Sequence, residues 1–258
     1  MGQTIQKIAV TPVHPMPSPR CADTLIVIPA FNEANNIGAI IDEIQNYTPG
    51  VPILVIDDGS SDGTAQTAKD HGALVISLLY NSGYGVALQT GFIYAVQNNY
   101  KVVIQMDGDR QHHPGSRPDL LREIQKDDVD VVIGSRFLGA GAYKNSFARS
   151  IGISLFRNLT SFIIGKKITD PTSGYQAIKG KAIEFIASDF YPPDYPDADF
   201  IILLNRVGFN LREIPVVMRP NMDNRSMHHG HKTVYYVFKM FLSIIVTLLR
   251  KTPSVRRP

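Results

Sequence analysis

Short apolar segments of strand length alternate along this chain with amphipathic segments of helix length, beginning at Asp23. Thr24–Ile28 and Val51–Ile56 are apolar runs that suit buried strands, and Asn36–Tyr47 between them carries isoleucines at helical spacing. Strands that are separated by helices of about 10–15 residues pair side by side in the same direction. The pattern therefore predicts an α/β fold built on a parallel sheet.

The same patterns continue to the end of the chain, although the regular alternation stops after Arg136. The predicted strands cover residues 24–28, 51–56, 73–78, 101–106, 130–134, 175–178 and 212–218. The predicted helices cover residues 36–47, 64–71, 85–98, 119–126, 145–164, 197–207 and 232–250. Polar clusters at 29–33, 57–63 and 107–111 follow strands. Because ligands bind beyond the carboxyl ends of parallel strands, we expect these clusters to gather at one sheet edge.

Asp107-Gly108-Asp109 is the sharpest local feature. Two carboxylates two residues apart, directly after a buried strand, can share one hard divalent cation such as Mg²⁺ or Mn²⁺, with Gln111 as a neutral oxygen ligand. Gly108 allows a close approach of the backbone to a ligand. The alternative is a simple turn, in which Asp and Gly are common.

Two further polar segments, residues 57–64 and 81–85, can be read either as turns or as parts of a ligand site. Residues 57–64 hold three carboxylates within six residues. A turn and a helix cap account for part of that pattern, and the base and ribose of a nucleotide would supply donors that relieve the repulsion. Residues 81–85 carry two glycines before a helix, which suits either a turn or an anion site.

The order of these segments resembles that of family-2 glycosyltransferases of GT-A fold. The resembling stretches, in the expected order, are residues 27–33, 57–64, 81–85, 105–114, 133–137 and 170–175. Within that family, the Asp-x-Asp-x-Gln-His-x-Pro stretch looks most like the dolichol-phosphate mannose synthase branch. The resemblance implies a Rossmann-like mixed sheet, mainly parallel, that is flanked by helices and followed by a C-terminal amphipathic helix.

The resemblance also implies roles for individual residues. The base and ribose of a nucleotide sugar are assigned to Pro29, Ala30, Glu33 and Asp58. Further contacts with the nucleotide sugar are assigned to Phe31, Gly83, Asp107, Gly108 and Arg136. The divalent metal on the diphosphate, Mg²⁺ or Mn²⁺, is assigned to Asp107, Asp109 and Gln111.

The catalytic candidates are Asp109, Asp197 and Asp199. An alcohol acceptor needs a general base, whereas a phosphate acceptor is already anionic, and the Asp197/Asp199 pair also fits a plain helix start. The chain departs from the branch at Arg110, where an apolar residue is usual, and it lacks the Arg and Gly of a terminal Arg-x-x-Gly-x-Ser motif. Contacts with the acceptor or a phosphate are assigned to Ser173, Arg219, Arg225 and Ser226.

The C-terminal part combines basic charge with an apolar helix. Residues 205–258 carry 10 Lys/Arg and 2 Asp/Glu, whereas residues 1–204 carry 16 and 21. Residues 234–249 are mostly apolar but shorter than the roughly 20 residues that span a bilayer, and Lys239, Ser243 and Thr247 form one narrow polar stripe. Such a helix can bind a membrane surface through residues 232–258, pack on a second subunit in a homo-oligomer, or cover its own domain.

We divide the chain into a flexible leader (residues 1–22), a glycosyltransferase domain of GT-A fold (23–220), and a mobile loop with the C-terminal helix and basic tail (221–258). The Pro-rich first 20 residues show no secretory signal. We therefore expect a cytoplasmic protein, with peripheral binding to the inner face of the cell membrane as one use of the helix.

The combination predicts an inverting, metal-dependent hexosyltransferase. It would move a sugar from a nucleotide-diphosphate sugar to a polyprenyl phosphate or a lipid-linked glycan in cell-envelope glycan synthesis. The alternative acceptor is the hydroxyl of a soluble or growing polysaccharide, with an Asp as general base.

Alternatives from other classes are a sugar nucleotidyltransferase and a non-catalytic nucleotide-sugar-binding protein. The first usually has a Gly-rich, Arg-containing loop where residues 29–33 stand, and the intact Asp107/Asp109 pair argues against the second. A Walker-type ATPase is disfavoured because its loop is missing, and a single Cys excludes an intramolecular disulfide or a Cys-cluster metal site. Nucleic acid is not an expected partner.

Overall fold

A computed structural model of the chain describes residues 23–108, 114–138, 147–192, 196–217, 219 and 231–252. The predicted leader (residues 1–22) and the predicted mobile loop (221–230) lie outside the described residues, as does the end of the basic tail from residue 253.

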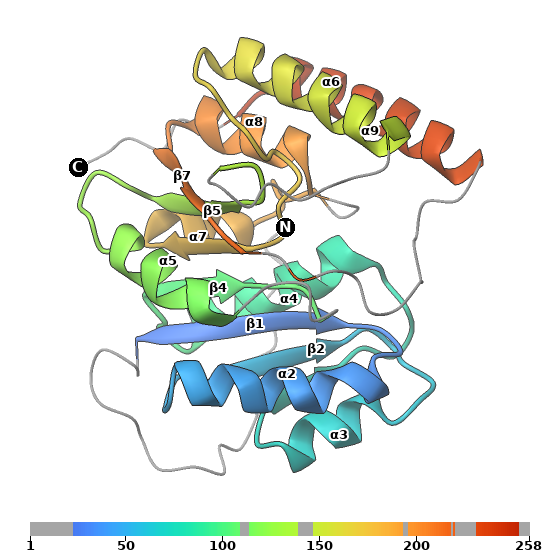
Figure 1. Cartoon of the computed structure of the whole chain (residues 1–258), viewed down its shortest axis with the longest axis vertical. Coiled ribbons are helices and arrows are strands. Elements are labelled where there is room, and N and C mark those ends of the chain that lie inside the picture. The colour runs from blue at the N-terminus through green and yellow to red at the C-terminus, as the bar shows by residue number, and fades with distance from the viewer. Residues whose placement is uncertain are drawn as a thin grey trace, which may run out of the picture.

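The strands form one mixed sheet in the order β3-β2-β1-β4-β6-β5-β7 (Figure 1). Their bounds are β1 (Thr24–Ala30), β2 (Ile53–Asp57), β3 (Leu74–Ser77), β4 (Val102–Gln105), β5 (Val131–Ser135), β6 (Gln176–Lys179) and β7 (Leu211–Pro215). β6 runs antiparallel to both β4 and β5, and the other neighbours are parallel. The expected mixed, mainly parallel sheet is confirmed.

The helices agree with the predicted bounds to within two residues. They are α2 (Ala34–Tyr47), α3 (Thr64–Asp70), α4 (Tyr84–Gln97), α5 (Arg117–Ile124), α6 (Phe147–Ile164), α8 (Ala198–Val207) and α9 (His231–Leu249). A 3₁₀ turn, η1 (Pro114–Ser116), precedes α5, and the six-residue α7 (Lys181–Ile186) was not predicted because it is too short to show a periodic pattern. β7 ends three residues before the predicted strand, at Pro215, which cannot donate a ladder hydrogen bond.

The sheet is covered on both faces because its central strands are apolar on both faces. Leu25 and Val27 of β1 pack in one cluster with side chains of α4, α7 and α8. Ile26 and Ile28 point the other way and pack with α2, α3 and α5. Burying one Leu, Ile or Val side chain contributes about 1.5–3 kcal/mol to the free energy of folding. The two clusters together therefore hold the strands, and the loops at their ends, in fixed relative positions.

Helices α6 and α9 lie side by side over α8 (Figure 1), and they join it through buried Phe156, Ala198, Ile202, Met240 and Ile244. The polar stripe of α9, which contains Ser243 and Thr247, faces α8 and the rest of the glycosyltransferase-like domain. Ser243 donates to a carboxylate of α8, and the carbonyl of the buried Thr247 accepts from Arg206. One face of α9 therefore covers its own domain, which is one of the three expected uses.

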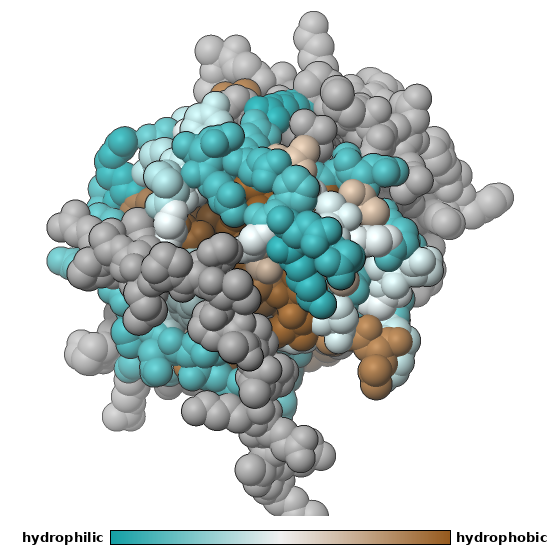
Figure 2. Space-filling view, turned by 90° about the horizontal axis from the view of Figure 1, so that it is seen from below, coloured by the Kyte–Doolittle hydropathy of each residue, from teal (hydrophilic) through white to brown (hydrophobic). Residues whose placement is uncertain are grey.

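The outer face of α9 is apolar and exposed. Phe238, Leu242, Ile245 and Leu249 recur at helical spacing and are 50–81% exposed, and Phe162 on the neighbouring α6 is 86% exposed. The opposite end of the molecule is different, because its described residues are mainly hydrophilic, with fewer apolar ones between them (Figure 2). In the described part of the chain, no helix is both long enough and apolar enough to cross a membrane.

Candidate active site

The predicted polar clusters meet at the carboxyl edge of the sheet. The amide of Asp58, just after β2, donates to the carbonyl of Ala30 at the end of β1, over 2.9 Å. Gly108, after β4, lies so close to β1 that a Cβ there would be 3.3 Å from the carbonyl oxygen of Pro29. The gathering predicted for segments 29–33, 57–63 and 107–111 is thus confirmed as far as residue 108. Asp109 and Gln111 lie outside the described residues.

Hydrogen bonds join the loops after β1 and β2 into one rim. Asn32 donates its amide to Ser60, and its side-chain oxygen accepts from the amide of Ser61, both over 2.9 Å. The amide of Glu33 donates to the Thr64 hydroxyl, and the predicted nucleotide-sugar contact Phe31, two residues earlier, is 45% exposed. This rim fixes the start of α2 next to the start of α3.

Backbone donors satisfy the acidic residues that follow β2. The buried carboxylate of Asp58 accepts the amides of Ser82 (2.7 Å) and Gly83 (2.9 Å), and Asp57 accepts the amide of Ser60. Burial tends to raise the pKa of Asp62, but hydrogen bonds from Thr64 and Ala34 outweigh this effect and lower the pKa. Part of the acidic cluster is therefore explained by loop structure, with Asp58 tying the loop before α4 to the rim.

Asp107 is held by the first residue of α4. The Tyr84 hydroxyl donates to Asp107 Oδ1 over 2.7 Å. Burial first, and then the Asp107 charge, raise the pKa of Tyr84 well above its usual value, so that this hydroxyl remains a donor. Gly174 closes the other side, since a Cβ there would lie 2.7 Å from Asp107 Oδ2 and 2.9 Å from the Tyr84 hydroxyl. Tyr84 and Gly174 belong to recognised motifs, but sequence reasoning assigned neither a role.

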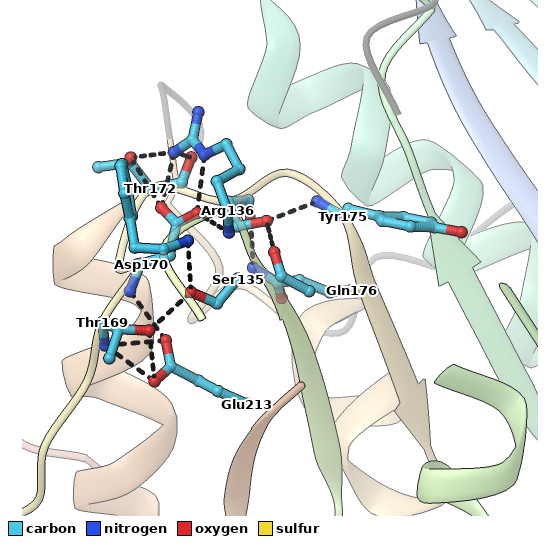
Figure 3. Close-up of polar contacts among 11 residues, drawn as sticks. Ser135, Arg136, Thr169, Asp170, Thr172, Tyr175, Gln176 and Glu213 are labelled. Carbon is cyan, nitrogen blue, oxygen red and sulfur yellow. Dashed lines mark hydrogen bonds and ion pairs between the residues drawn. The ribbon is translucent and has the colours of Figure 1, made fainter. Parts of the chain in front are cut away.

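Arg136, after β5, forms a bidentate pair with the fully buried Asp170 (Figure 3). Nε and Nη2 donate to the two carboxylate oxygens over 2.7 and 2.6 Å, and Nη2 also donates to the Thr172 hydroxyl over 2.7 Å. Burial opposes the charge, but Asp170, Asp107 and Asp197 together raise the pKa of Arg136. The site therefore holds a fixed cation beside two of its candidate acids.

The turn that carries Asp170 is fastened on both sides (Figure 3). Glu213 of β7 accepts the amides of Thr169 and Asp170 over 2.8 Å each. Ser173 is buried, and its hydroxyl donates to the carbonyl of Gly134 over 2.6 Å. Ser173 was predicted to contact the acceptor substrate or a phosphate, but its hydroxyl is already hydrogen-bonded within the protein. The only sequence signal for Glu213 was an acidic residue inside a predicted strand.

We expect Asp170→Ala to lower the free energy of unfolding by about 3–5 kcal/mol, because it leaves the mostly buried Arg136 guanidinium without its counter-charge. Asp128→Ala is the matched control. It removes an exposed partner of Arg212, so we expect a loss of about 1 kcal/mol or less. Urea denaturation measures both values, and similar losses for the two variants would contradict this assignment.

The structure separates the two candidate acids at the start of α8. Asp199 is 1% exposed, and its carboxylate accepts the Ser243 hydroxyl of α9 over 2.5 Å and the Asp197 amide over 3.1 Å. Burial raises the pKa of Asp199, and these hydrogen bonds only partly offset the rise. Asp197 is half-buried and lies near enough to Arg136 and Tyr84 to raise the pKa of each. Of these two acids, Asp197 is the one whose charge acts on Arg136 and Tyr84, whereas Asp199 is buried against α9.

The structure does not bring Arg219 to this edge. Arg219 forms a bidentate ion pair with Glu43, with 2.8 Å between Nη1 and Oε2. Glu43 lies on α2, ten residues after the Glu33 that precedes the helix, which places it about 15 Å further along the helix axis. Arg225 and Ser226 lie outside the described residues. Within the part of the chain that is described, no three His, Cys, Asp or Glu side chains form a group that could hold a metal ion.

Comparisons with known proteins show what this chain is similar to. The model of glycosyl transferase family 2 matches residues 25–186. The polyprenol monophosphomannose synthase of Mycolicibacterium smegmatis is 33% identical over 250 residues, which cover 93% of this chain and 92% of that protein. The UDP-N-acetylglucosamine–dolichyl-phosphate N-acetylglucosaminyltransferase of Methanococcus voltae is 25% identical over 251 residues, covering 89% and 98%.

A solved structure shares the fold. Glucosyl-3-phosphoglycerate synthase from Mycobacterium tuberculosis, crystallised with Mn²⁺, uridine diphosphate and glucosyl-3-phosphoglycerate, superposes with a TM-score of 0.65 at 22% identity. The match covers 88% of this chain and 78% of that one.

Proposed function

The chain belongs to glycosyltransferase family 2, and we propose that it transfers a sugar from a nucleotide-diphosphate sugar to a polyprenyl phosphate. The observation that carries this proposal is the arrangement of Asp107, Tyr84, Gly174 and Arg136 at the carboxyl edge of the sheet. It places a fixed carboxylate and a fixed cation together where ligands of such sheets bind.

The nucleotide-sugar donor would lie along the rim that the loops after β1 and β2 form. Pro29, Ala30, Phe31, Glu33, Asp58 and Gly83 are the residues proposed for the nucleotide. Their support is that the loops after β1 and β2 and the loop before α4 are fixed to one another by the hydrogen bonds of Asn32 and Asp58. Such preorganisation lowers the cost of ordering a ligand.

Asp107, with Asp109 and Gln111, would hold Mg²⁺ or Mn²⁺. The residues present fit a cation, since Tyr84 orients Asp107 through Oδ1 and Gly174 has no side chain on the other side of the carboxylate. When bound, the metal offsets the negative charge that develops on the departing nucleoside diphosphate. Arg136 supplies a second positive charge from its fixed pair with Asp170.

The acceptor is proposed to be a polyprenyl phosphate because the two relatives are named for polyprenol or dolichyl-phosphate substrates. A phosphate oxygen is already a nucleophile and needs no general base, so Asp197 would position substrate. For the alternative acceptor, a polysaccharide hydroxyl, Asp197 would be the base, because it is the less buried of the two acids and its charge acts on Arg136. The expected single displacement inverts the anomeric centre.

A panel of nucleotide sugars, each with Mn²⁺ or Mg²⁺, tests this function. We expect one donor to be hydrolysed slowly without acceptor and consumed rapidly with polyprenyl phosphate, and we expect chelation of the metal to stop both reactions. Consumption of a sugar phosphate and a nucleoside triphosphate instead would favour the nucleotidyltransferase.

The outer face of α6 and α9 is proposed to rest on the cytoplasmic membrane surface, where a polyprenyl phosphate is embedded. Its support is the row of exposed apolar side chains and the exposed basic Lys251, which follows the end of α9. Deleting α9 would be a poor test, because Ser243, Met240 and Ile244 also hold the domain together.

We therefore expect Leu242→Asp/Ile245→Asp to lose most binding to vesicles that contain anionic lipid, since two charges replace apolar contacts without touching the inner face of α9. Flotation of the full chain with the vesicles measures this binding. The matched control is Leu79→Asp, at the most exposed large apolar residue of the described chain, which lies away from α9. Equal flotation of wild type and the double variant would reject this surface.

A further inference from the structure

Tyr191 is a buried tyrosine beside the site that the preceding argument does not use. It lies in the connection between α7 and α8, and 3% of its surface is exposed. Its hydroxyl has no hydrogen-bond partner among the described residues. A buried hydroxyl normally has a partner, since leaving it without one is costly. This hydroxyl is therefore a candidate contact for a ligand.

The position of Tyr191 is fixed by the packing of its ring and by the backbone that precedes it. It packs edge-on against Phe200 of α8, with 5.1 Å between the ring centroids. The preceding residues, Asp189 and Phe190, are fixed by Arg250 at the end of α9, which donates to both of their carbonyls over 3.0 Å and lies over the Phe190 ring. A side chain held in this way presents its hydroxyl in one place, as a binding contact requires.

The charges around this hydroxyl indicate which part of the substrate it meets. Burial, followed by the charges of Asp199 and Asp197, raises the pKa of Tyr191 well above its usual value, so that the hydroxyl stays protonated. It is also near enough to Tyr84, the donor to Asp107, to raise the pKa of Tyr84. Tyr191 thus lies near the acids of α8 and near Tyr84, which holds the carboxylate proposed for the metal.

A phosphate would be repelled by the Asp197 carboxylate near this place, whereas a neutral sugar would not. Carboxylates accept hydrogen bonds from hydroxyl groups, and the tyrosine hydroxyl can donate one. Together they offer an acceptor and a donor to neighbouring hydroxyls of a hexose. We propose that Tyr191 hydrogen-bonds a hydroxyl of the sugar that is transferred. This inference rests on the proposed function, since it assigns the sugar subsite of the same donor.

The test is calorimetric titration of the full chain, wild type and Tyr191→Phe, in the presence of Mn²⁺. The ligands are UDP-glucose, UDP-N-acetylglucosamine and GDP-mannose, each compared with UDP or GDP alone. We expect Tyr191→Phe to bind the preferred nucleotide sugar about tenfold more weakly and the nucleoside diphosphate as tightly as wild type does. Tyr94→Phe, at a buried tyrosine three turns along α4 from Tyr84, is the control and should bind both normally.

Two further measurements separate this role from a structural one. Without ligand, Tyr191→Phe should melt at the same temperature as wild type or higher, because it removes an unsatisfied buried hydroxyl. Deoxy analogues of the preferred donor should include one that binds wild type about tenfold more weakly but shows no further loss with Tyr191→Phe.

Several outcomes would overturn the inference. Equal affinity of wild type and Tyr191→Phe for the nucleotide sugar would remove the contact, and an equal loss for the nucleoside diphosphate would move it away from the sugar. If wild type bound none of the nucleotide sugars, the proposed function itself would fall. That failure is distinguishable because it appears before any variant is compared.

Discussion

Asp107→Asn is expected to lower kcat/KM for sugar transfer about 1000-fold, equivalent to about 4 kcal/mol of transition-state stabilisation. Asparagine has nearly the same shape and can still accept the Tyr84 hydroxyl. It lacks the negative charge that a hard divalent cation requires of its ligands. The free energy of unfolding should therefore change little while the metal response is lost.

The measurement is the rate of transfer across a Mn²⁺ titration. Asp42→Asn is the matched control, because Asp42 is an exposed carboxylate on α2 that pairs with His71, away from the sheet edge. The control should keep both turnover and metal response. Wild-type turnover and an unchanged Mn²⁺ dependence in Asp107→Asn would contradict the assignment of Asp107.

Gly174→Ala is expected to lower kcat/KM about 100-fold, although it adds only one methyl group. Its Cβ would meet Asp107 Oδ2 at 2.7 Å and the Tyr84 hydroxyl at 2.9 Å, so the carboxylate or the tyrosine has to move. A displacement of about 1 Å in such a constellation is enough for a loss of this size. Steady-state kinetics, together with a melting curve, measure the effect.

Gly91→Ala provides the contrast, because it also creates a close contact, 2.4 Å from Cγ1 of Val27, but inside the packing of α4 on β1. We expect it to lower the melting temperature while the folded fraction keeps its activity. If Gly174→Ala behaved in the same way, losing stability and keeping its specific activity, the proposed geometry around Asp107 would be wrong.

Most of the fold could be predicted from the sequence because local patterns of apolar residues indicate most of its strands and helices. The strands of the parallel half are continuous apolar runs, and α2 carries isoleucines at regular helical spacing. The antiparallel insertion of β6 between β4 and β5 could not be predicted in this way, because pairing between distant strands leaves no local signal. Helix α7 was not predicted because its six residues are too few to show a helical pattern.

The site was predictable in part. Topology alone brings residues 30, 58 and 108 together, and the structure bears this out. Local sequence could not rank Asp197 against Asp199, because their difference comes from burial by α9 and from Ser243, which lies 44 residues away in sequence. It also could not orient the polar stripe of α9, since the same stripe fits a helix that faces water or one that faces its own domain.

The most direct test of the account is the chemical identity of the product. The full chain is incubated with its preferred labelled nucleotide sugar, Mn²⁺ and a polyprenyl phosphate in detergent, and the lipid fraction is analysed by mass spectrometry and NMR. We predict one hexose joined to the lipid phosphate, with the anomeric configuration opposite to that of the donor, and about 1000-fold slower formation of this product with Asp107→Asn. No labelled lipid with any donor, or a lipid product that keeps the anomeric configuration of the donor, would contradict the account.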